Sequence, residues 1–400
     1  MIRFVLADLR RLWPAALVII CLVGLASALS IGVTLQERAL RLGSARAADK
    51  FDLVIGAAGS ETQLILSSVF LQAAPLPLLS GDVLTKLRQD PRVAWAAPIG
   101  FGDSYETYPI VGSTPELLSA LNNGAPVEGS APHGLYDAVI GSSVALALGQ
   151  SFAPVHGLTG NGGRVHTDFT YKVVGKMAPG GTAWDRAIIV PIEAVWAVHG
   201  MHAEHNETPV IPGLLDGSVT GKLPGVPAIL VKPRTIADAY KLRGAYRGDT
   251  TMAAFPGEVL TRLYATLGDA RTAMSFIALA SQGLVAAAIA LIAVAHVNQR
   301  RRQIGALRAF GAPRSAIFAI VWSELIFLMA CGIALGFAIG WLAVKLLSAA
   351  FTAQNGVVLP VAFAPSDLGL ALGLILGAAV IATIPAVLAF RAPAATALRS

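Results

Sequence analysis

The sequence predicts an α-helical membrane protein with four transmembrane helices and a large α+β extracytoplasmic domain inserted between the first helix and the second. Three observations lead to this fold class. Of the 400 residues, 55% are hydrophobic and only 14% are charged, whereas a soluble domain carries about 25% charged residues. The chain also contains four long apolar runs, and arginines gather on one side of them.

Each apolar run is long enough to cross a bilayer, because a transmembrane helix needs about 20 apolar residues. The first run contains Ala26-Ser27-Ala28, which resembles a signal-peptidase site. A cleaved signal peptide has a shorter apolar core, so we expect a retained anchor, continued by a polar helical stretch. The four runs cover residues 12–35, 272–295, 325–344 and 368–390.

The basic residues predict how the chain is oriented. Of the 30 lysines and arginines, 19 lie in residues 36–271, and ten of the other 11 are arginines at the two ends of the chain or around the loop 298–316. Such residues favour the cytoplasmic side, so both ends and this loop are predicted to be cytoplasmic. The predicted divisions are 1–35 with the first helix, 36–271 as the extracytoplasmic domain, and 272–400 with the last three helices.

The inserted domain is predicted to fold on its own core. Cys21 and Cys331 both lie in apolar runs, so no disulfide framework supports it. Its 19 basic and 21 acidic residues nearly cancel, which gives no support to a nucleic-acid partner. Short apolar runs between turn residues predict strands at 51–55, 93–98, 108–111, 138–141, 171–174, 187–190 and 228–231, and helices at 81–89, 115–121, 142–148, 192–198 and 235–246.

Small residues recur at every fourth position in three of the apolar runs. This spacing places them on one face of each helix, where helix backbones can approach closely in lipid. We expect packing among the four helices of one chain, with an interface to a second chain as the alternative. The residues are Gly24, Ala28 and Gly32 in the first run, Gly332, Gly336 and Gly340 in the third, and Gly369, Gly373 and Gly377 in the fourth.

Glu324 is an ionisable residue at the start of the third run. A carboxylate at the edge of a membrane needs a partner or water. We expect Arg314 or Arg308 to pair with it. The runs contain no series of acidic residues and histidines, which argues against a proton or ion pathway through the bilayer.

Histidines cluster in the inserted domain. Five of the seven in the chain are His156, His166, His199, His202 and His205. Imidazole nitrogen is a common ligand of zinc, copper and nickel, so a metal site, with zinc as the ion, is one hypothesis. The spacing matches no closed zinc motif. A polar loop with solvated histidines is the alternative.

The loop 298–316 reads N-Q-R-R-R-Q-I-G-A-L-R-A-F-G-A-P-R-S-A. It resembles the signature of FtsX-like permeases, the transmembrane subunits of MacB-type ABC systems, in which an arginine cluster precedes E-I-G-x-x-[RK]-A-x-G-A. The chain departs from this pattern at Gln303, where the family has Glu. Residues 391–399 resemble the closing P-x-x-A-L-R of the family, and 137–149, 171–175 and 185–190 resemble elements of its outer domain.

This resemblance implies a coupling loop that contacts a separate ATPase. Three of its apolar residues are at helical spacing and could enter a groove of that partner, while its arginines could steer docking or bind acidic lipid. A plain positive-inside loop is the alternative. The residues expected to couple are Arg301, Ile304, Gly305, Leu307, Arg308, Phe310 and Gly311, with Glu324 transmitting the movement through the membrane.

The resemblance also implies the function. The chain contains no P-loop, so it is expected to be a non-catalytic subunit without its own cofactor, with ATP and magnesium held by the ATPase. It would sit in a bacterial inner membrane as a pair of permease chains, expected to be identical, with a periplasmic or lipoprotein partner, and serve export, extraction or signalling. The alternatives are an ATPase-coupled regulator of an envelope enzyme and a zinc-linked periplasmic module.

Overall fold

The computed structural model describes residues 13–72, 74–122, 128–157, 165–201, 223–299 and 311–391. The chain divides into two compact units. The helical unit comprises Met1–Leu40, Leu267–Ser348 and Pro360–Ser400, and the sheet unit comprises Arg41–Thr266 and Ala349–Leu359. A short segment from between the last two helices, Ala349–Leu359, belongs to the sheet unit.

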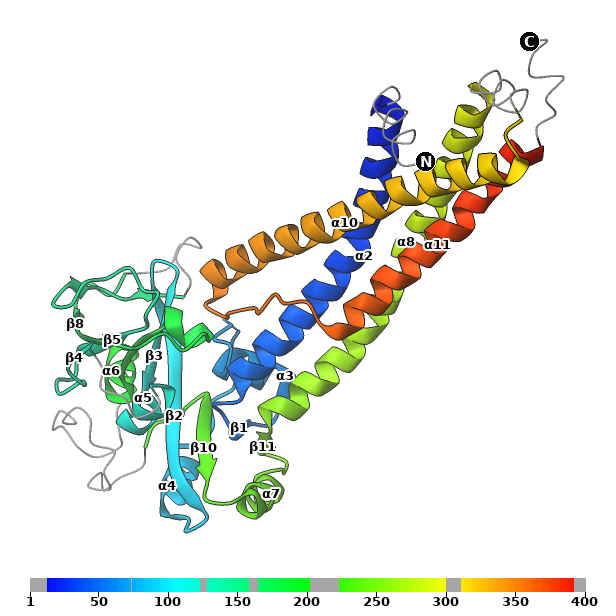
Figure 1. Cartoon of the computed structure of the whole chain (residues 1–400). Helices are drawn as coiled ribbons and strands as arrows, with labels where there is room; N and C mark the ends of the chain where they lie inside the picture. The colour runs from blue at the N-terminus through cyan, green and yellow to red at the C-terminus, as the bar shows by residue number, and fades with distance from the viewer. Residues whose placement is uncertain are drawn as a thin grey trace. The chain divides into compact units, whose positions relative to one another are not determined.

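The helical unit is built from four long helices (Figure 1): α2 (Trp13–Ala48), α8 (Pro256–Gln299), α10 (Arg314–Asn355) and α11 (Pro365–Arg391). Among the described residues, three segments are long and apolar enough to cross a membrane: Ala16–Ala48, Arg314–Asn355 and Pro365–Leu388. The predicted span 272–295 lies within α8. Many side chains of that stretch lie outside the described residues, so four spans stay a prediction.

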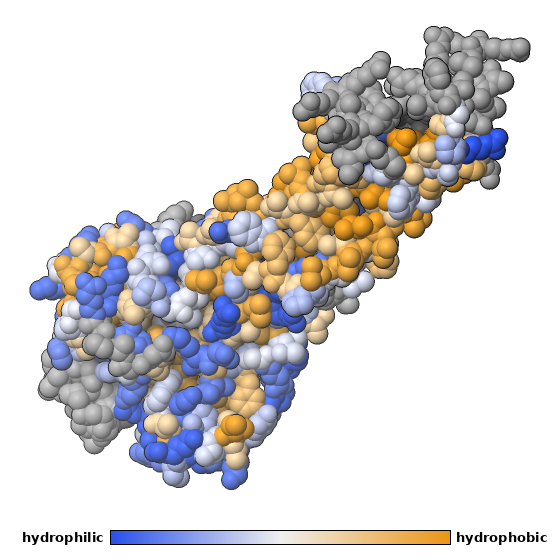
Figure 2. Space-filling view, viewed as in Figure 1, coloured by the Kyte–Doolittle hydropathy of each residue, from blue (hydrophilic) through white to orange (hydrophobic). Residues whose placement is uncertain are grey.

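The surface of these helices is apolar, as expected of lipid-facing segments. Figure 2 colours the helical unit largely orange, for hydrophobic residues, and the sheet unit largely blue and white. Leu25, Leu342 and Val380 are large apolar side chains that remain exposed. Such broad apolar exposure is rare in soluble proteins, and together with the three long apolar helices it makes the chain a membrane protein.

The helix α2 is longer than a membrane requires and contains the sequence that resembles a cleavage site. The helix α2 continues beyond residue 40 to Ala48, as the predicted polar helical stretch required. The sequence that resembles a cleavage site lies in the middle of this unbroken helix, where Ser27 is buried. The retained anchor stays a prediction.

The sheet unit contains one mixed sheet of eleven strands among the described residues, with the central order β11-β1-β10-β2-β3-β9-β5-β8-β4. The pairs β3–β9 and β5–β8 are parallel, and the other pairs are antiparallel. The strands are β1 (Leu53–Ala57), β2 (Val93–Tyr105), β3 (Tyr108–Ser113), β4 (Glu128–Gly129), β5 (Asp137–Ile140), β6 (Ser151–Phe152), β7 (Val155–His156), β8 (Tyr171–Lys176), β9 (Ile188–Pro191), β10 (Ala228–Pro233) and β11 (Thr251–Ala254).

Both faces of the sheet are buried under helices. Alternate residues of a strand point to opposite faces, so Val54 of β1 joins one hydrophobic core while Leu53 and Ile55 join another. The helices α3 and α5 contribute to the first core, and α4, α6 and α7 contribute to the second. These helices are α3 (Glu61–Ser68), α4 (Gly81–Gln89), α5 (Pro115–Leu121), α6 (Ile192–Val198) and α7 (Ile236–Ala245), with a 3-10 turn η1 (Ala183–Arg186).

Side-chain capping accounts for two of the helices that the sequence predicts well, α4 and α7. The helices α4, α5 and α6 have the predicted bounds, and α7 lies within its predicted range. The hydroxyls of Ser80 and Thr235 accept from backbone N–H groups in the first turns of α4 and α7. Helix α3 was missed, although Ser60 followed three residues later by Gln63 is a capping signature, and the Ser60 hydroxyl accepts from the Gln63 N–H.

The predicted helix at 142–148 is wrong. This segment consists of turns and irregular backbone. The N–H of Ser143 donates to the carbonyl of Asp185, and the N–H of Ala145 donates to the Tyr108 hydroxyl. These donors bind distant parts of the sheet unit, and a helix would have turned them toward its own carbonyls.

Candidate functional site

The glycines of α10 make close contact with α2. A Cβ atom built on Gly332 would lie 2.7 Å from the Val23 Cβ, and one on Gly336 would lie 2.5 Å from the Gly24 carbonyl oxygen. A Cβ atom on Gly340 would lie 2.9 Å from the Ala28 carbonyl oxygen. No real side chain fits at these distances, so these glycines allow the two backbones to touch.

The glycines of α11 are placed differently. A Cβ atom on Gly369, Gly373 or Gly377 would meet no described atom within 4 Å. The glycines of α10 and α11 share the same four-residue spacing. Among the residues that the structure describes, however, only those of α10 pack against another helix.

Glu324 is buried in α10. Arg314 lies ten residues earlier on the same helix, a rise of about 15 Å, which is too far for the direct ion pair that the sequence suggested. Arg308 lies outside the described residues.

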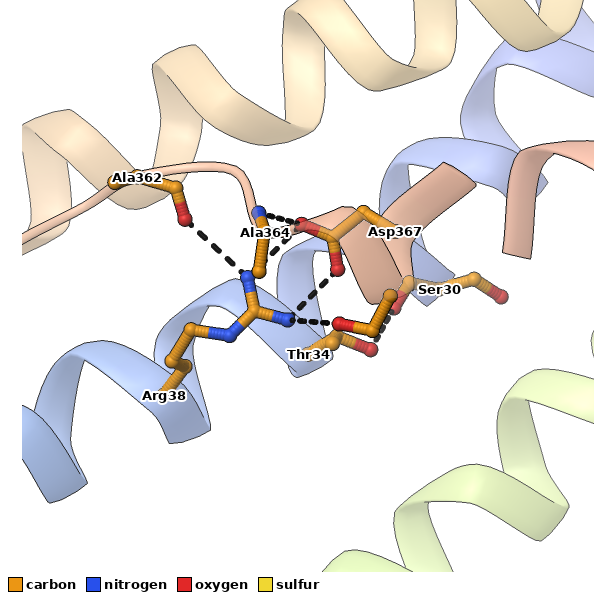
Figure 3. A network of polar contacts seen from close by, with 7 residues as sticks. Ser30, Thr34, Arg38, Ala362, Ala364 and Asp367 are labelled. Carbon is orange, nitrogen blue, oxygen red and sulfur yellow. Dashed lines mark hydrogen bonds and ion pairs between the residues drawn. The ribbon is translucent and has the colours of Figure 1, made fainter. Parts of the chain in front are cut away.

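A buried ion pair joins the end of α2 to the start of α11 (Figure 3). The Arg38 guanidinium donates to both carboxylate oxygens of Asp367, at 2.7 and 2.9 Å. Arg38 also donates to the Ala362 carbonyl at 3.2 Å and the Ser366 hydroxyl at 3.3 Å, and the Ala364 N–H donates to Asp367 at 2.8 Å. We call this arrangement the Arg38–Asp367 clamp.

Sequence reasoning missed this clamp, although a signal was present. Asp367 directly precedes the fourth apolar run, and Arg38 follows the first. Charged residues at the ends of membrane spans commonly pair with one another. That signal marks each residue as one in need of a partner. Because the two residues are 329 positions apart, it does not show that they pair with each other.

The coupling loop falls mostly outside the described residues. This holds for Arg301, Ile304, Gly305, Leu307, Arg308 and Phe310. Gly311 is described, is exposed, and has a φ of +90° in the turn before α10. Only glycine adopts this backbone conformation without strain, so Gly311 has a structural reason to be where it is.

A second buried carboxylate, Asp103 of β2, lies at the centre of three histidines. Its Oδ1 atom is 3.3 Å from Nδ1 of His156, 3.7 Å from Nε2 of His166 and 3.5 Å from Nε2 of His199. The Asp103 side chain is only 3% exposed, while that of His156 is 56% exposed. We call these four residues the Asp103–histidine cluster.

The strands and helix α6 position these side chains. His156 of β7 pairs directly with Asp103 across the sheet, so the two side chains lie on the same face. A bulge at Gly102 interrupts the pairing of β2 with β3 just before Asp103, and bulges redirect side chains. His199 follows the last residue of α6, and the His166 N–H donates to the Pro154 carbonyl.

The cluster unites three of the five histidines that the sequence singled out. His202 and His205 lie outside the described residues. Asp103 was missed, although an aspartate inside an apolar strand pattern is itself a signal, because buried carboxylates need partners. The remaining described histidine of the sheet unit, His133, is exposed and lies outside the cluster.

Several polar atoms of this region are buried with no hydrogen-bond partner among the described residues. They are Oδ2 of Asp103, Nε2 of His166 and the hydroxyl of Tyr171. Burial raises the pKa of Tyr171 far above its usual range, and the negative charge of Asp103 raises it further. Tyr171 therefore stays neutral, and its phenol adds no charge of its own to the region around Asp103.

Residues 349–359 are held by the sheet unit itself. The Arg186 guanidinium of η1 donates to the Ala353 carbonyl and to the Thr107 hydroxyl, both at 2.8 Å. The Val358 N–H donates to the Gly181 carbonyl at 3.1 Å. The last turns of α10 are thus built into the sheet unit.

Comparison with known proteins identifies the C-terminal part of the chain. Two solved structures are similar to the chain. The periplasmic region of MacB from Actinobacillus actinomycetemcomitans matches at 10% identity and a TM-score of 0.34, over 55% of this chain and 95% of that one. The extracellular domain of the noncanonic ABC-type transporter YknZ from Gram-positive bacteria matches at 10% identity and a TM-score of 0.29, over 50% of this chain and 98% of that one. No curated protein sequence matches the chain. Residues 275–393 match the model of the FtsX-like permease C-terminal domain, so this part of the chain is similar to that domain.

Proposed function

We propose that this ABC-type permease component transmits movement from a separate ATPase to its sheet unit, and that it works as a pair of permease chains. The family match gives the general class. The proposal adds the direction of transmission, the use of two chains, and the ATPase as the source of movement.

The observation that carries the proposal is the continuity of three helices. The helices α2, α8 and α10 have 36, 44 and 42 residues, which correspond to lengths of about 54 to 66 Å, compared with a hydrocarbon core of about 30 Å. Each has one end in the helical unit and the other in the sheet unit. Since no loop interrupts them, a shift at one end is carried to the other.

Contacts within each unit would make these helices move together. The glycines of α10 lie against the backbone of α2, so the two helices cannot separate without losing close packing. The Arg38–Asp367 clamp ties α2 to α11 within the helical unit. Arg186 holds the last turns of α10 within the sheet unit.

The ATPase would bind the loop 298–316, where the motif resembles that of FtsX-like permeases. Ile304, Leu307 and Phe310 offer apolar side chains at helical spacing, the pattern by which a helix enters a groove. ATP and magnesium would be bound by the partner, and this chain would take no catalytic part. The arginine distribution supports an orientation with this loop and both ends of the chain in the cytoplasm and the sheet unit outside the inner membrane.

The test of the partner is co-purification of the full chain from native membranes in mild detergent. We expect an ABC ATPase in equal amount, and its loss with Leu307→Glu or Phe310→Asp. The matched control is Ile236→Glu, an apolar-to-acidic change at an exposed position of α7, which should retain the ATPase. An ATPase missing from the wild-type preparation, or retained by both loop variants, would refute the proposal.

The test of transmission is hydrogen exchange in the sheet unit of that complex. Adding a non-hydrolysable ATP analogue should change the exchange of wild-type strands. Inserting two glycines after Ser348, where α10 passes from one unit to the other, should keep the ATPase bound but reduce that change. Equal changes in both proteins would contradict transmission through α10. The identity of any third component in the wild-type complex would distinguish transport or extraction from regulation of an envelope enzyme.

A further inference from the structure

We propose that the Asp103–histidine cluster is a binding site for one divalent transition-metal ion, with Zn²⁺ as the ion that fits best. The ligands would be one carboxylate oxygen of Asp103 and one nitrogen each of His156, His166 and His199. This inference does not depend on the ATPase, because all four residues lie in the sheet unit.

The three distances from Asp103 Oδ1 are close to the edge lengths of a metal-centred tetrahedron. Zinc binds imidazole nitrogen and carboxylate oxygen at about 2.0–2.2 Å, in tetrahedral geometry. Two ligand atoms at such distances and at the tetrahedral angle lie about 3.3–3.6 Å apart. The three nitrogens lie 3.3, 3.5 and 3.7 Å from Asp103 Oδ1. The ligand atoms of Asp103, His156 and His199 all lie within 4.8 Å of one another.

The orientation of His199 points to a cation between the ligands. Its Nδ1 atom is 2.9 Å from the Val195 carbonyl, and a carbonyl oxygen only accepts, so Nδ1 carries the hydrogen. In the neutral ring Nε2 then presents a lone pair, and it faces the Asp103 carboxylate at 3.5 Å. Two acceptors face each other favourably only when a proton or a metal ion lies between them. A hydrogen bond from the second ring nitrogen to a backbone carbonyl is also the usual way in which metal-binding histidines are oriented.

The orphaned atoms favour the metal over the proton. Nε2 of His166 and Oδ2 of Asp103 are buried and have no hydrogen-bond partner among the described residues. At 3.7 Å from Oδ1, the His166 nitrogen is too far for a hydrogen bond. One ion in the middle of the cluster would satisfy His166 together with the other two histidines, whereas a proton bridges only two atoms.

The charge of the site also calls for a cation. Asp103 is almost fully buried, and within 4 Å the described residues offer it three imidazoles but no lysine or arginine. A buried carboxylate without a positive partner is costly. An imidazole carries no permanent positive charge, whereas a divalent ion does. Imidazole ligands favour Zn²⁺, Cu²⁺ or Ni²⁺ over Mg²⁺ and Ca²⁺.

The scaffold holds these ligands before any ion arrives. Asp103 and His156 are fixed by strand register, and His199 by the end of α6. Gly102 leaves room for the His199 ring, since a Cβ atom there would lie 3.2 Å from its Nε2 atom. The largely exposed His156 ring gives an ion a way in from solvent. A site on regular elements with an open side can bind and release metal without unfolding.

The experiment uses the full chain in mild detergent, purified through a tag without histidine and stripped with a chelator. Zn²⁺ binding is measured by competition with a coloured chelator, and Co²⁺ is added as a spectroscopic probe. We expect one Zn²⁺ per chain and the intense visible bands of tetrahedral Co²⁺. His156→Ala, His199→Ala and Asp103→Asn should each weaken binding at least about tenfold, while His133→Ala, an exposed histidine of the same unit, should leave it unchanged.

Two further arms keep the result unambiguous. The double variant His202→Ala/His205→Ala should bind Zn²⁺ as the wild type does. X-ray absorption of the zinc-loaded wild type, which needs no variant to fold, should show nitrogen and oxygen ligands with the signature of imidazole. The proposal is overturned if His156→Ala/His166→Ala/His199→Ala retains wild-type affinity, if only the 202/205 variant loses it, or if the wild type binds no metal or shows a sulfur or all-oxygen shell.

Discussion

Asp367 and Asp103 are buried to nearly the same degree, with side chains 5% and 3% exposed, yet their surroundings differ. Asp367 receives both arms of the Arg38 guanidinium and the Ala364 N–H, so its two oxygens are satisfied. Asp103 has three imidazoles at one oxygen and no hydrogen-bond partner at the other among the described residues.

The difference shows how a fold can treat a buried negative charge. Arginine is always charged and matches a carboxylate with two parallel hydrogen bonds, so the Arg38–Asp367 clamp is complete without any ligand. Histidine, unlike arginine, carries no permanent positive charge, so the Asp103–histidine cluster has no fixed cation among its own side chains. The first carboxylate is a structural device, and the second has the properties of a binding site.

A third carboxylate shows a further solution. Glu193 at the start of α6 is buried, and burial raises its pKa above the usual value, partly offset by its own backbone N–H and the charge of Arg88. Glu193 can escape the cost of burial by taking up a proton. The following predictions test this comparison, from the largest effect to the smallest.

Arg38→Leu should destabilise the helical unit most, by about 3–5 kcal/mol, because it leaves Asp367 buried without its cation. Unfolding of the full chain in mild detergent, followed by circular dichroism, measures the loss. Arg46→Leu is the matched control, since Arg46 is an exposed arginine on the same helix. Equal losses in the two variants would mean that the clamp contributes no more than an exposed charge.

Saturating zinc should stabilise the wild type by about 2.7 kcal/mol at a concentration a hundredfold above its dissociation constant. Asp103→Asn should lose most of this gain. In chelator, however, the same variant should stay within about 1 kcal/mol of the wild type, since it removes a buried charge that has no complete partner. A large loss in chelator would show that Asp103 is already satisfied, as Asp367 is.

The double variant Arg38→Leu/Asp367→Leu should recover part of the loss caused by Arg38→Leu alone, by about 1–3 kcal/mol. Replacing both members of a buried pair by apolar residues removes the unpaired charge as well as the attraction. The same unfolding measurement completes the mutant cycle. Additive losses would indicate that the two side chains do not act on each other.

Glu193→Gln should raise stability slightly at neutral pH, by at most about 1 kcal/mol. A carboxyl group whose pKa is raised on folding costs stability once it is ionised, so the cost is complete above the folded pKa and absent below the unfolded one. The gain should therefore shrink as the pH falls through the raised pKa of Glu193, and it should be absent below about 4.5, the ordinary value for this group. A gain independent of pH would point to packing instead of ionisation.

Local patterns in the sequence predicted much of the fold. The apolar runs located the long helices because the thickness of a bilayer sets a minimum length, and capping residues such as Ser80 located helices of the sheet unit. The helix predicted at 142–148 does not form, because N–H groups of this segment donate to Asp185 and Tyr108 instead. The sequence showed that histidines are concentrated in this domain, but it did not show that three of them lie around Asp103.

The sequence by itself determined which segments are apolar, where helices begin, and which residue types were available for chemistry, because these depend on neighbours along the chain. Only the tertiary structure decided that Arg38 pairs with Asp367, 329 positions away, and that His156 lies opposite Asp103. It also decided that the glycines of α10 pack against another helix, whereas those of α11 contact none among the described residues. These outcomes depend on strand register and helix packing, in which residues far apart in the chain come together, and no local pattern encodes their partners.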